Sequence, residues 1–592
     1  MENSAARNPP LNPFLLALCA VLVGVVGGVG AVAFRALIAF FHNLLFLGKL
    51  SLHYDANIHT IPSPWGPFVI LVPVLGAAGV SFLITQFAPE AKGHGVPEVM
   101  DAIYYKRGII RPVVAAVKAL ASGLSIGSGG SVGREGPIIQ IGSSFGSTLG
   151  QYVQMATWQR ITLIAAGTGA GIAATFNTPI GGLLFATEIM LHEVSVRTLV
   201  PVAISTATAT YIGQVFFGVH PAFYIPGLQT PFSELPNPLL VGSFFGVGII
   251  TGIGSAIYIH SIYLLEDIFE QRIPGNYYAR HMAGMFAVGI LIYLSMTFLG
   301  HYYFEGVGYA GIEDVLTGKL SQFDLLILLF VFKLLATSLT LGSGASGGIF
   351  SPALFLGAMA GGAYGVALKT IFPLLPINPP VFAIAGMAGM VSGSTGAAIT
   401  ALVMVFEMTL DYNAVLPLTV TVATSNGVRA LLSRETIYTL KLARRGHFMP
   451  NALRTNFQYL RQAKSIMEGS AAILPGSMPI GDFTRLASEE ENRVFLVEDR
   501  NSILGIVSSK DAPKAVDTLS DMTLGDIAEK KYITVSEESP LFEILSRMRE
   551  EKATAAIVVP KEKPLTGGSV AGIITRDHIA DLIERSLISY EE

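Results

Sequence analysis

The sequence predicts a multi-span α-helical membrane protein built from two repeated halves with broken helices, followed by a small soluble α/β domain. Long apolar runs separated by Gly- and Pro-rich breaks fill residues 1–450, and one Gly-rich segment occurs twice among them. The composition of residues 451–592 is that of an ordinary soluble protein. Charged residues make up only 14% of the 592 residues, against roughly 25% in soluble domains.

Composition also argues against several classes of function. The net charge of -4 gives no reason to expect a nucleic acid partner. The single cysteine, Cys19, provides neither a disulfide framework nor a Cys-based metal site. Because no metal-ligand cluster, nucleophile–base set or lysine-containing phosphate loop stands out, we expect neither an enzyme nor a metalloprotein.

The first apolar run is expected to remain in the membrane as a helix. It starts near Phe14, reaches Ala33 and continues past Arg35, without the charged start, short apolar core and cleavage site of a signal peptide. Many of the later runs approach the roughly 20 residues that a membrane-spanning helix needs. These runs lie at 67–87, 112–126, 161–190, 198–217, 239–262, 281–299, 324–341, 381–409 and 413–432.

A Gly-rich segment at residues 118–137 recurs without a gap at residues 333–352. The copies read K-A-L-A-S-G-L-S-I-G-S-G-G-S-V-G-R-E-G-P and K-L-L-A-T-S-L-T-L-G-S-G-A-S-G-G-I-F-S-P. Each is an apolar stretch interrupted by glycines. Interrupted helices at matching places in two halves of a membrane protein predict a substrate site at the two breaks.

The repeat extends beyond this pair of segments. Residues 166–180 align with residues 385–399, and the helices expected after them each carry one acid, Glu188 and Glu407. The halves therefore run over about 70–220 and 285–440, in an inverted or a parallel arrangement.

The C-terminal part, residues 451–592, reads as two copies of a small α/β unit. The runs V-F-L-V and A-I-V-V each lead to a second strand that ends in Gly-Ile-x-Ser/Thr and enters a helix. Basic residues flank the last membrane run, which favours the cytoplasmic side for this part, and Arg7 favours that side for the N-terminus. The flanking residues are Arg434, Lys441, Arg444 and Arg445.

Three Gly-rich loops, at 93–98, 127–137 and 342–352, each open an expected helix. Backbone N–H groups at a helix start, with the positive end of the helix dipole behind them, form a ready anion site. Glu135 lies inside one loop, where its carboxylate would compete with an anion. An ionisable side chain within the membrane is expected to be functional.

The motifs G-H-G-V-P, G-R-E-G-P and G-I-F-S-P, in that order, resemble those of the CLC family of chloride channels and chloride/proton exchangers. A membrane domain followed by a pair of CBS domains is a known arrangement of that family, so the resemblance covers nearly the whole chain. It implies an integral protein of the cell or inner membrane, surrounded by lipid, homodimeric, with one pore per subunit. Voltage gating is a further property that the resemblance implies.

The resemblance also implies roles for individual residues. Glu135 would be the gate, a carboxylate that occupies an anion site and swings away when protonated. Ile349 and Phe350 would offer N–H groups to a central anion, and Tyr438 its hydroxyl, although an interfacial aromatic is the alternative for Tyr438. The remaining anion-site positions are Gly95, Arg134, Gly136 and Gly348.

Two positions depart from the family pattern. His94 replaces the usual serine of the first motif. A neutral imidazole would donate a hydrogen bond to the anion, and a protonated one would attract anions by its charge. Alternatively, the side chain points away and the anion is held by backbone groups alone. Ile189 stands where exchangers tend to carry a second acid, which favours passive conduction. Glu188 is expected to be structural, while His192 and Glu193 could form a substitute proton route.

Two further features leave alternatives open. Lys118 and Lys333 hold equivalent places in the repeat, and either raise the potential for anions or snorkel to an interface. In the tail, a hydroxyl and an acid in each copy resemble the ribose-binding signature of CBS domains, although the second pair has a shorter spacing. These residues are Ser508 and Asp511, and Thr575 and Asp577. The tail either binds an adenine nucleotide or serves as a dimerising scaffold.

The sequence thus favours a passive, gated chloride channel with Glu135 as its gate. The alternative in mechanism is a proton-coupled chloride exchanger. A more distant alternative is a membrane-embedded nucleotide sensor, which the intact anion loops disfavour.

Overall fold

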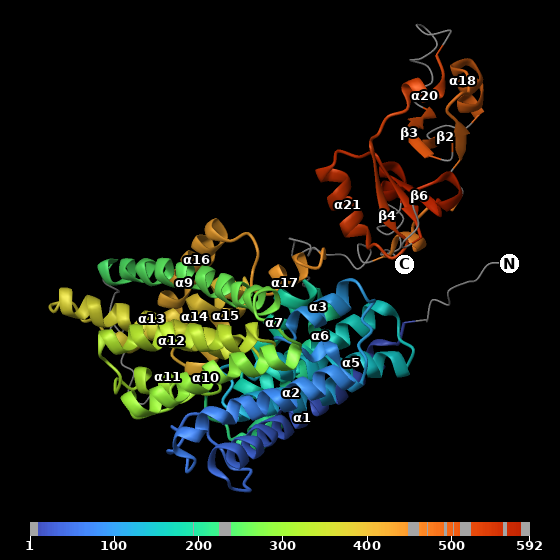
Figure 1. Cartoon of the computed structure of the whole chain (residues 1–592). Coiled ribbons are helices and arrows are strands. Elements are labelled where there is room, and N and C mark those ends of the chain that lie inside the picture. Colours follow the sequence, from blue (N-terminus) through green and yellow to red (C-terminus); the bar gives the residue numbers. More distant parts are fainter. Residues whose placement is uncertain are drawn as a thin grey trace. The chain divides into compact units, whose positions relative to one another are not determined.

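The computed structural model describes residues 10–192, 195–223, 238–447, 461–469, 472–489, 494–500, 502–509, 522–560 and 565–581. The chain divides into two compact units, Met1–Leu453 and Arg454–Glu592. The first unit is built from helices, and the second contains two small sheets (Figure 1).

The first unit follows the chain through two sets of helices, coloured blue to teal and green to orange in Figure 1. The first set comprises α1 (Pro13–Leu47), α2 (Val72–Phe87), α3 (Val96–Tyr104), α4 (Val113–Gly127), α5 (Glu135–Tyr152), α6 (Thr157–Phe176), α7 (Pro179–Phe185) and α8 (Val196–Phe217). The second comprises α9 (Pro238–Gln271), α10 (Tyr277–Leu299), α11 (Tyr309–Leu316), α12 (Phe323–Gly342), α13 (Phe350–Ile371), α14 (Pro379–Thr395), α15 (Ala398–Thr409), α16 (Val415–Leu432) and α17 (Thr439–Ala443).

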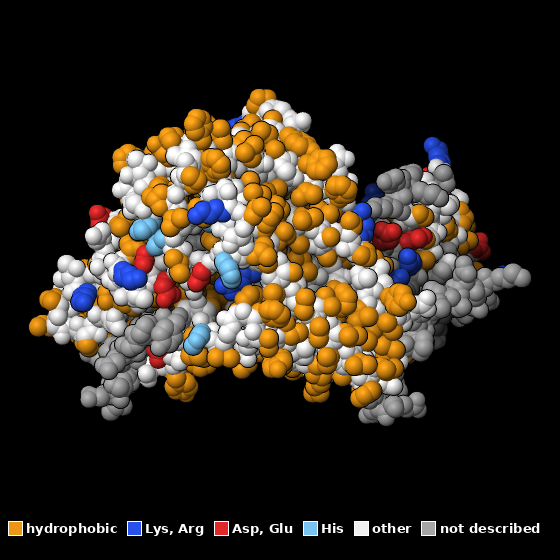
Figure 2. Space-filling view, turned by 90° about the horizontal axis from the view of Figure 1, so that it is seen from below, with side chains coloured by type: hydrophobic (Ala, Val, Ile, Leu, Met, Phe, Trp, Pro, Cys, Tyr) orange, Lys and Arg blue, Asp and Glu red, His pale blue; other side chains and the backbone are white. Residues whose placement is uncertain are grey.

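Eight helices within the described residues are long and apolar enough to cross a membrane. The 35 residues of α1 extend over about 50 Å, which exceeds the roughly 30 Å hydrocarbon core of a bilayer. A helix that is longer than the hydrocarbon core fits into a bilayer when it tilts away from the membrane normal. Hydrophobic side chains cover much of the face shown in Figure 2, as expected for a surface in contact with lipid.

Two of the expected apolar runs are each divided into two helices. Within 161–190, α6 ends before Asn177, whose φ is 59°, and α7 begins at a proline. Within 381–409, α14 ends before Gly396, whose φ is 80°. A residue in the left-handed region ends a helix, and proline is well suited to the first turn of the next one. The breaks therefore recur in both halves.

Two buried helices, α5 and α13, were missing from the expected runs. Both are interrupted in sequence by glycine, serine or alanine, which lowers their apparent hydrophobicity. These small residues allow close helix contact: a Cβ atom built on Gly142 of α5 would lie 2.2 Å from the Gly167 carbonyl oxygen of α6. The close packing of small residues therefore explains why α5 and α13 are buried, although their mean hydropathy is modest.

The second unit confirms the predicted duplication. One sheet has the order β1 (Ile473–Pro475), β2 (Val494–Asp499), β3 (Ser502–Ser508), and the other β4 (Tyr532–Ser536), β5 (Ala555–Val559), β6 (Gly572–Thr575). In each sheet the first pair is parallel and the second antiparallel. The described residues of this unit form the α-helices α18 (Ile480–Glu489), α20 (Leu524–Ile527) and α21 (Leu541–Glu550). Leu496, Ile557 and Ile573 share one core cluster that joins the two copies.

Candidate anion site

The three Gly-rich loops meet inside the first unit and are joined by backbone hydrogen bonds. Gly93 donates to the carbonyl of Ala345 at 3.0 Å and accepts from the N–H of Gly347 at 3.3 Å. Gly133 and Gly348 exchange two hydrogen bonds, at 2.7 and 2.6 Å. The starts of α3, α5 and α13 are therefore held together at one point.

Glycine is required where these loops approach most closely. A Cβ atom on Gly136 would lie 2.1 Å from the carbonyl oxygen of His94. Gly95 has a φ of 82°, and a Cβ atom there would lie 3.0 Å from the Oε1 atom of Gln140. Side chains other than hydrogen at either position would separate the loops. These two glycines shape the site rather than bind through side chains.

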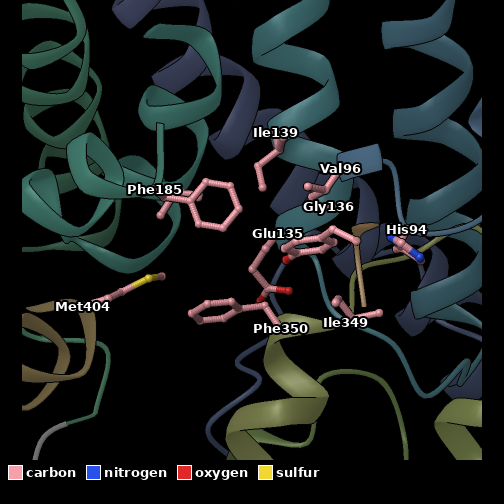
Figure 3. Close-up of a pocket in the computed structure, with 11 residues that line it drawn as sticks. His94, Val96, Glu135, Gly136, Ile139, Phe185, Ile349, Phe350 and Met404 are labelled. Carbon is pink, nitrogen blue, oxygen red and sulfur yellow. The ribbon is translucent and has the colours of Figure 1, made fainter. Parts of the chain in front are cut away.

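A small enclosed cavity lies where the loops meet (Figure 3). It offers about 10 Å³ to the centre of a water-sized sphere, which is room for about one water molecule. Its lining is largely apolar with a few polar groups, as in most ligand sites. The predicted residues in the lining are His94, Glu135, Gly136, Ile349, Phe350 and Tyr438.

Glu135, the first residue of α5, directs its carboxylate to the start of α13. Its Oε2 atom accepts from the N–H of Ser351 at 3.3 Å, and its Oε1 atom accepts from the Ser351 hydroxyl and, at 3.1 Å, from the Tyr309 hydroxyl. Only 2% of Glu135 is exposed. Figure 3 shows its side chain beside Phe350 at the start of α13. The carboxylate thus occupies a helix N-terminus, where anions bind.

Tyr309 and Ser351 are functional candidates that sequence reasoning missed. A signal for Tyr309 exists, because G-V-G-Y at 306–309 follows the pattern of G-H-G-V at 93–96 in the other half. The equivalence is visible in the structure through the two lysines of the repeat. Lys118 donates to the carbonyl of Gly93 at 2.7 Å, and Lys333 donates to the carbonyl of Gly306 at 2.8 Å.

Both lysines are fully buried, so neither snorkels to an interface. Each binds a second carbonyl, Ala91 at 3.0 Å for Lys118 and Phe304 at 3.4 Å for Lys333. Hydrogen bonds to several carbonyls compensate in part for burying an ammonium group. The lysines therefore brace the loops that precede α3 and α11.

Arg134 lies outside the small cavity. Its guanidinium carbon is 5.1 Å from the centre of the Tyr309 ring, a cation–π distance. Arg134 and Arg35 also line a larger cavity of about 610 Å³, by the same measure, together with Asp55 and Glu313. The linings of the larger and the smaller cavity therefore include neighbouring residues of the chain, Arg134 and Glu135.

Tyr438 precedes α17 and is 98% buried, which disagrees with an exposed interfacial aromatic. Its ring lies 5.9 Å from the ring of His94 and 6.4 Å from that of Phe185. The ring therefore forms a wall of the cavity, and the structure places its side chain among the other predicted residues.

His94 has one ring nitrogen directed to a neighbouring tyrosine. Its Nε2 atom lies 3.4 Å from the hydroxyl oxygen of Tyr263, and that hydroxyl donates to the carbonyl of Ile437 at 2.6 Å. Because the hydroxyl has one hydrogen, a bond to His94 requires the hydrogen on Nε2. The buried Nδ1 atom has no hydrogen-bond partner among the described residues.

The residues around the expected inner proton site separate into different environments. Ile189 is buried within a π-helical turn, Ala186–Leu191. Glu188 accepts hydrogen bonds from the N–H and the hydroxyl of Thr400 at 2.8 and 2.6 Å, so it caps α15. His192 follows the turn with a φ of 50°, and its Nδ1 atom is 2.8 Å from the Tyr104 hydroxyl. Glu193 lies outside the described residues.

In the second unit, the predicted nucleotide residues lie at equivalent strand ends. Ser508 ends β3 and Thr575 ends β6, where the Thr575 hydroxyl accepts from the N–H of His578 at 3.2 Å. Asp577 lies two residues after Thr575, whereas Asp511 lies outside the described residues. No group of three or more potential metal ligands occurs within the described parts of the chain.

Comparisons with known proteins agree with this architecture. A family profile described as voltage gated chloride channel matches residues 76–430, and a CBS-domain profile matches residues 524–585. The chain is 32% identical over 450 residues to the H(+)/Cl(-) exchange transporter ClcA of Vibrio parahaemolyticus, covering 73% of this chain and 90% of that one.

Two solved structures are similar to the structure described above. One is a slow cyanobacterial Cl-/H+ antiporter, with a TM-score of 0.62 at 26% identity, covering 74% of this chain and 98% of that one. The other is a eukaryotic CLC transporter, with a TM-score of 0.62 at 19% identity, covering 95% of this chain and 98% of that one. The second likeness concerns the fold alone. The fold class predicted from the sequence is confirmed.

Proposed function

The chain belongs to the voltage-gated chloride channel family, the CLC family, and from this premise we propose that it exchanges chloride for protons across a membrane. Anion transport of the CLC type is common to the family. The relative and the antiporter structure described above are both proton-coupled, which supports exchange over the passive channel that the sequence favoured.

The observation that carries this proposal is the position of the Glu135 carboxylate. It is buried at the N-terminus of α13, where it accepts from the backbone N–H of Ser351, a group that a chloride ion could also accept from. An ionised carboxylate and an anion compete for that position. Protonation removes the charge, so the side chain is released and chloride enters. One residue then carries the proton and opens the anion path.

The anion would be held mainly by backbone N–H groups. The first N–H groups of a helix lack intrahelical partners, and those of Ile349 and Phe350 lie at the start of α13 beside the cavity. The Tyr438 hydroxyl is the side-chain donor that we assign to the same anion. Gly348 uses its N–H on Gly133 and so contributes the shape of the turn.

His94 fits a neutral role in this scheme. With the Nε2 hydrogen directed to Tyr263, the Nδ1 atom carries a lone pair and repels an anion. We therefore assign the first loop to backbone coordination at this position. Replacing His94 with Ser would supply a hydroxyl donor, and tighter chloride binding in calorimetry is the expected result; unchanged or weaker binding would contradict this assignment.

Passive conduction is the second candidate, because one observation favours it. Ile189 is buried and cannot titrate, so the usual inner proton acceptor is missing. If exchange occurs, its inner proton step uses another group. His192, with its contact to the Tyr104 hydroxyl, is the group that we assign to this step.

We further propose a homodimer with both termini and the tail in the cytoplasm. Glu188 and Glu407 are partly exposed on the first unit, where contact with lipid would be costly. A second copy covering them removes that cost. Ile399 is 54% exposed, and its N–H donates to Glu188, so it should lie in this interface. The Ile399→Cys variant is then expected to form an intermolecular disulfide, and its absence under oxidising conditions would contradict this interface.

For the tail, we propose adenine nucleotide binding beside Ser508 and Thr575, with dimerisation alone as the alternative. A fluorescent ATP analogue should bind the full-length protein, and Ser508→Ala should weaken that binding. A tail that binds no analogue at millimolar concentration would be a scaffold.

The proposed exchange is tested by recording chloride efflux and proton movement together from proteoliposomes. Uphill proton movement driven by a chloride gradient, in a fixed ratio to chloride, is the expected result. Chloride flux without proton movement would establish the passive channel instead.

A further inference from the structure

The hydroxyl groups of Tyr309 and Ser351 contact both each other and the gate carboxylate. The two hydroxyl oxygens are 2.7 Å apart, the Ser351 hydroxyl donates to Glu135, and the Tyr309 hydroxyl is 3.1 Å from the same carboxylate oxygen. Tyr309 is 1% exposed and Ser351 is fully buried. The Glu135 carboxylate is therefore held by two side-chain hydroxyls as well as by the backbone N–H of Ser351.

The Tyr309 ring is fixed in place by its surroundings. It begins α11 directly after Gly308, whose φ is 80°. The Arg134 guanidinium lies over the ring, and the Phe223 ring meets it edge to face at 5.3 Å. A ring held on two sides presents its hydroxyl at a fixed position, so its contact with the gate is built into the fold.

The charge of Glu135 determines how strongly these two hydroxyls bind it. Each hydroxyl has one hydrogen, and both hydrogens can be donated to the Oε1 atom of an ionised Glu135. A protonated Glu135 keeps one acceptor oxygen but has no charge, so the same two hydrogen bonds become weaker. The arrangement therefore holds the carboxylate more firmly than the acid.

We propose that Tyr309 and Ser351 form a hydroxyl clasp that holds the ionised Glu135 at the start of α13 and releases it on protonation. The inference rests on the proposed role of Glu135 as the gate. Donors to a carboxylate favour its charged form. The clasp would therefore keep transport slow until the pH is low enough to protonate Glu135. Tyr309 and Ser351 would act as positioning residues, because they act through Glu135.

Other titratable groups also face the gate and remain in place when the clasp is removed. On the elements packed around Glu135 these are His94, Arg134, Tyr258, Lys333 and Tyr438. Variants that remove only one hydroxyl leave their charges unchanged. A shift in the pH dependence of transport then reports on the clasp itself.

The test is the chloride transport rate of Tyr309→Phe and Ser351→Ala in proteoliposomes, measured as a function of pH. In each variant the pH of half-maximal transport should rise by about one unit, a tenfold change in proton affinity. The proton-to-chloride ratio should stay as in the unmodified protein. An unchanged or lower midpoint in both variants would overturn the proposal.

Two controls separate the possible failures. Tyr302→Phe removes a buried tyrosine hydroxyl that accepts from the N–H of Ser63, away from the gate, and should leave the midpoint unchanged. Combining either clasp variant with Glu135→Gln should produce no further shift. If Glu135→Gln alone keeps the pH dependence, the gate assignment fails; if only the clasp variants lack a shift, the clasp fails.

Discussion

Glu188 caps α15 and Glu407 caps α7, so each acid holds the first turn of a short helix in the opposite half. Glu188 accepts from the N–H of Thr400 at 2.8 Å, and Glu407 from the N–H of Gly181 at 2.6 Å. A carboxylate at a helix start satisfies otherwise unpaired N–H groups and interacts favourably with the helix dipole. The two halves are thus joined by the pair of acids that the repeat relates.

This reciprocity predicts matching effects of Glu188→Gln and Glu407→Gln. Each should lower the free energy of unfolding by about 1 kcal/mol, because a charged cap is replaced by a neutral one. Thermal unfolding of the purified variants measures the loss. Neither should change the proton-to-chloride ratio. Loss of proton movement in Glu188→Gln alone would identify Glu188 as a proton site instead of a cap.

Glu135→Gln should remove the pH dependence and the proton coupling while leaving chloride flux. Glutamine has a similar shape but no charge, so it does not compete with chloride at the start of α13. Paired flux recordings from proteoliposomes provide the measurement, with Glu407→Gln as the control acid outside the cavity. A complete stop of chloride flux would contradict the role of Glu135 as a gate.

Removing the Tyr438 hydroxyl should weaken chloride binding without unfolding the protein. For Tyr438→Phe we expect a loss of about 1 kcal/mol, or roughly fivefold in Kd, typical of one hydrogen bond. Tyr438→Ala should weaken binding further, because it opens the cavity wall. Isothermal calorimetry is the direct measurement. Equal chloride affinity in the phenylalanine variant and the unmodified protein would exclude the hydroxyl as a ligand.

Lys118→Met and Lys333→Met should both destabilise the protein. Lys333→Met leaves the Phe304 and Gly306 carbonyls without their lysine donor, at a cost of about 1–3 kcal/mol per unsatisfied group. The loss should be smaller for Lys118→Met, because the Ala91 carbonyl still accepts from the Ser346 hydroxyl and the Gly93 carbonyl from the N–H of Gly347. Unfolding in detergent should show a lower midpoint for both variants, with Lys319→Met, on an exposed side chain, as the control. If stability is kept but chloride affinity falls, the lysines act through their charge.

The sequence was sufficient for those parts of the site that lie within short motifs. The loops before α3, α5 and α13 are each continuous in sequence, and their glycines reflect close approach at Gly95 and Gly136. The repeat related Glu188 to Glu407 and Lys118 to Lys333 before any contact was known. Such features depend on local backbone, which a motif describes.

Contacts between segments that are distant in the chain could not be predicted from the sequence. Tyr309 and Glu135 are 174 residues apart, and Ser351 and Glu135 are 216 apart, so their contact depends on the packing of α11, α5 and α13. Helices α5 and α13 were missed for a related reason, because small residues that permit close packing also interrupt an apolar pattern. The tyrosine–histidine contact at His192 arises in the same way.

The contact between His192 and Tyr104 predicts how an exchanger lacking an acid at residue 189 receives its inner proton. His192→Gln removes the titratable ring but keeps polar atoms, and should reduce proton movement at least tenfold while chloride flux persists. Tyr104→Phe removes only the hydroxyl that orients the imidazole, and should give a smaller reduction. The paired recordings of chloride and protons measure both. Proton movement unchanged in His192→Gln would exclude this histidine, and chloride flux lost in equal measure would indicate structural damage rather than a broken proton path.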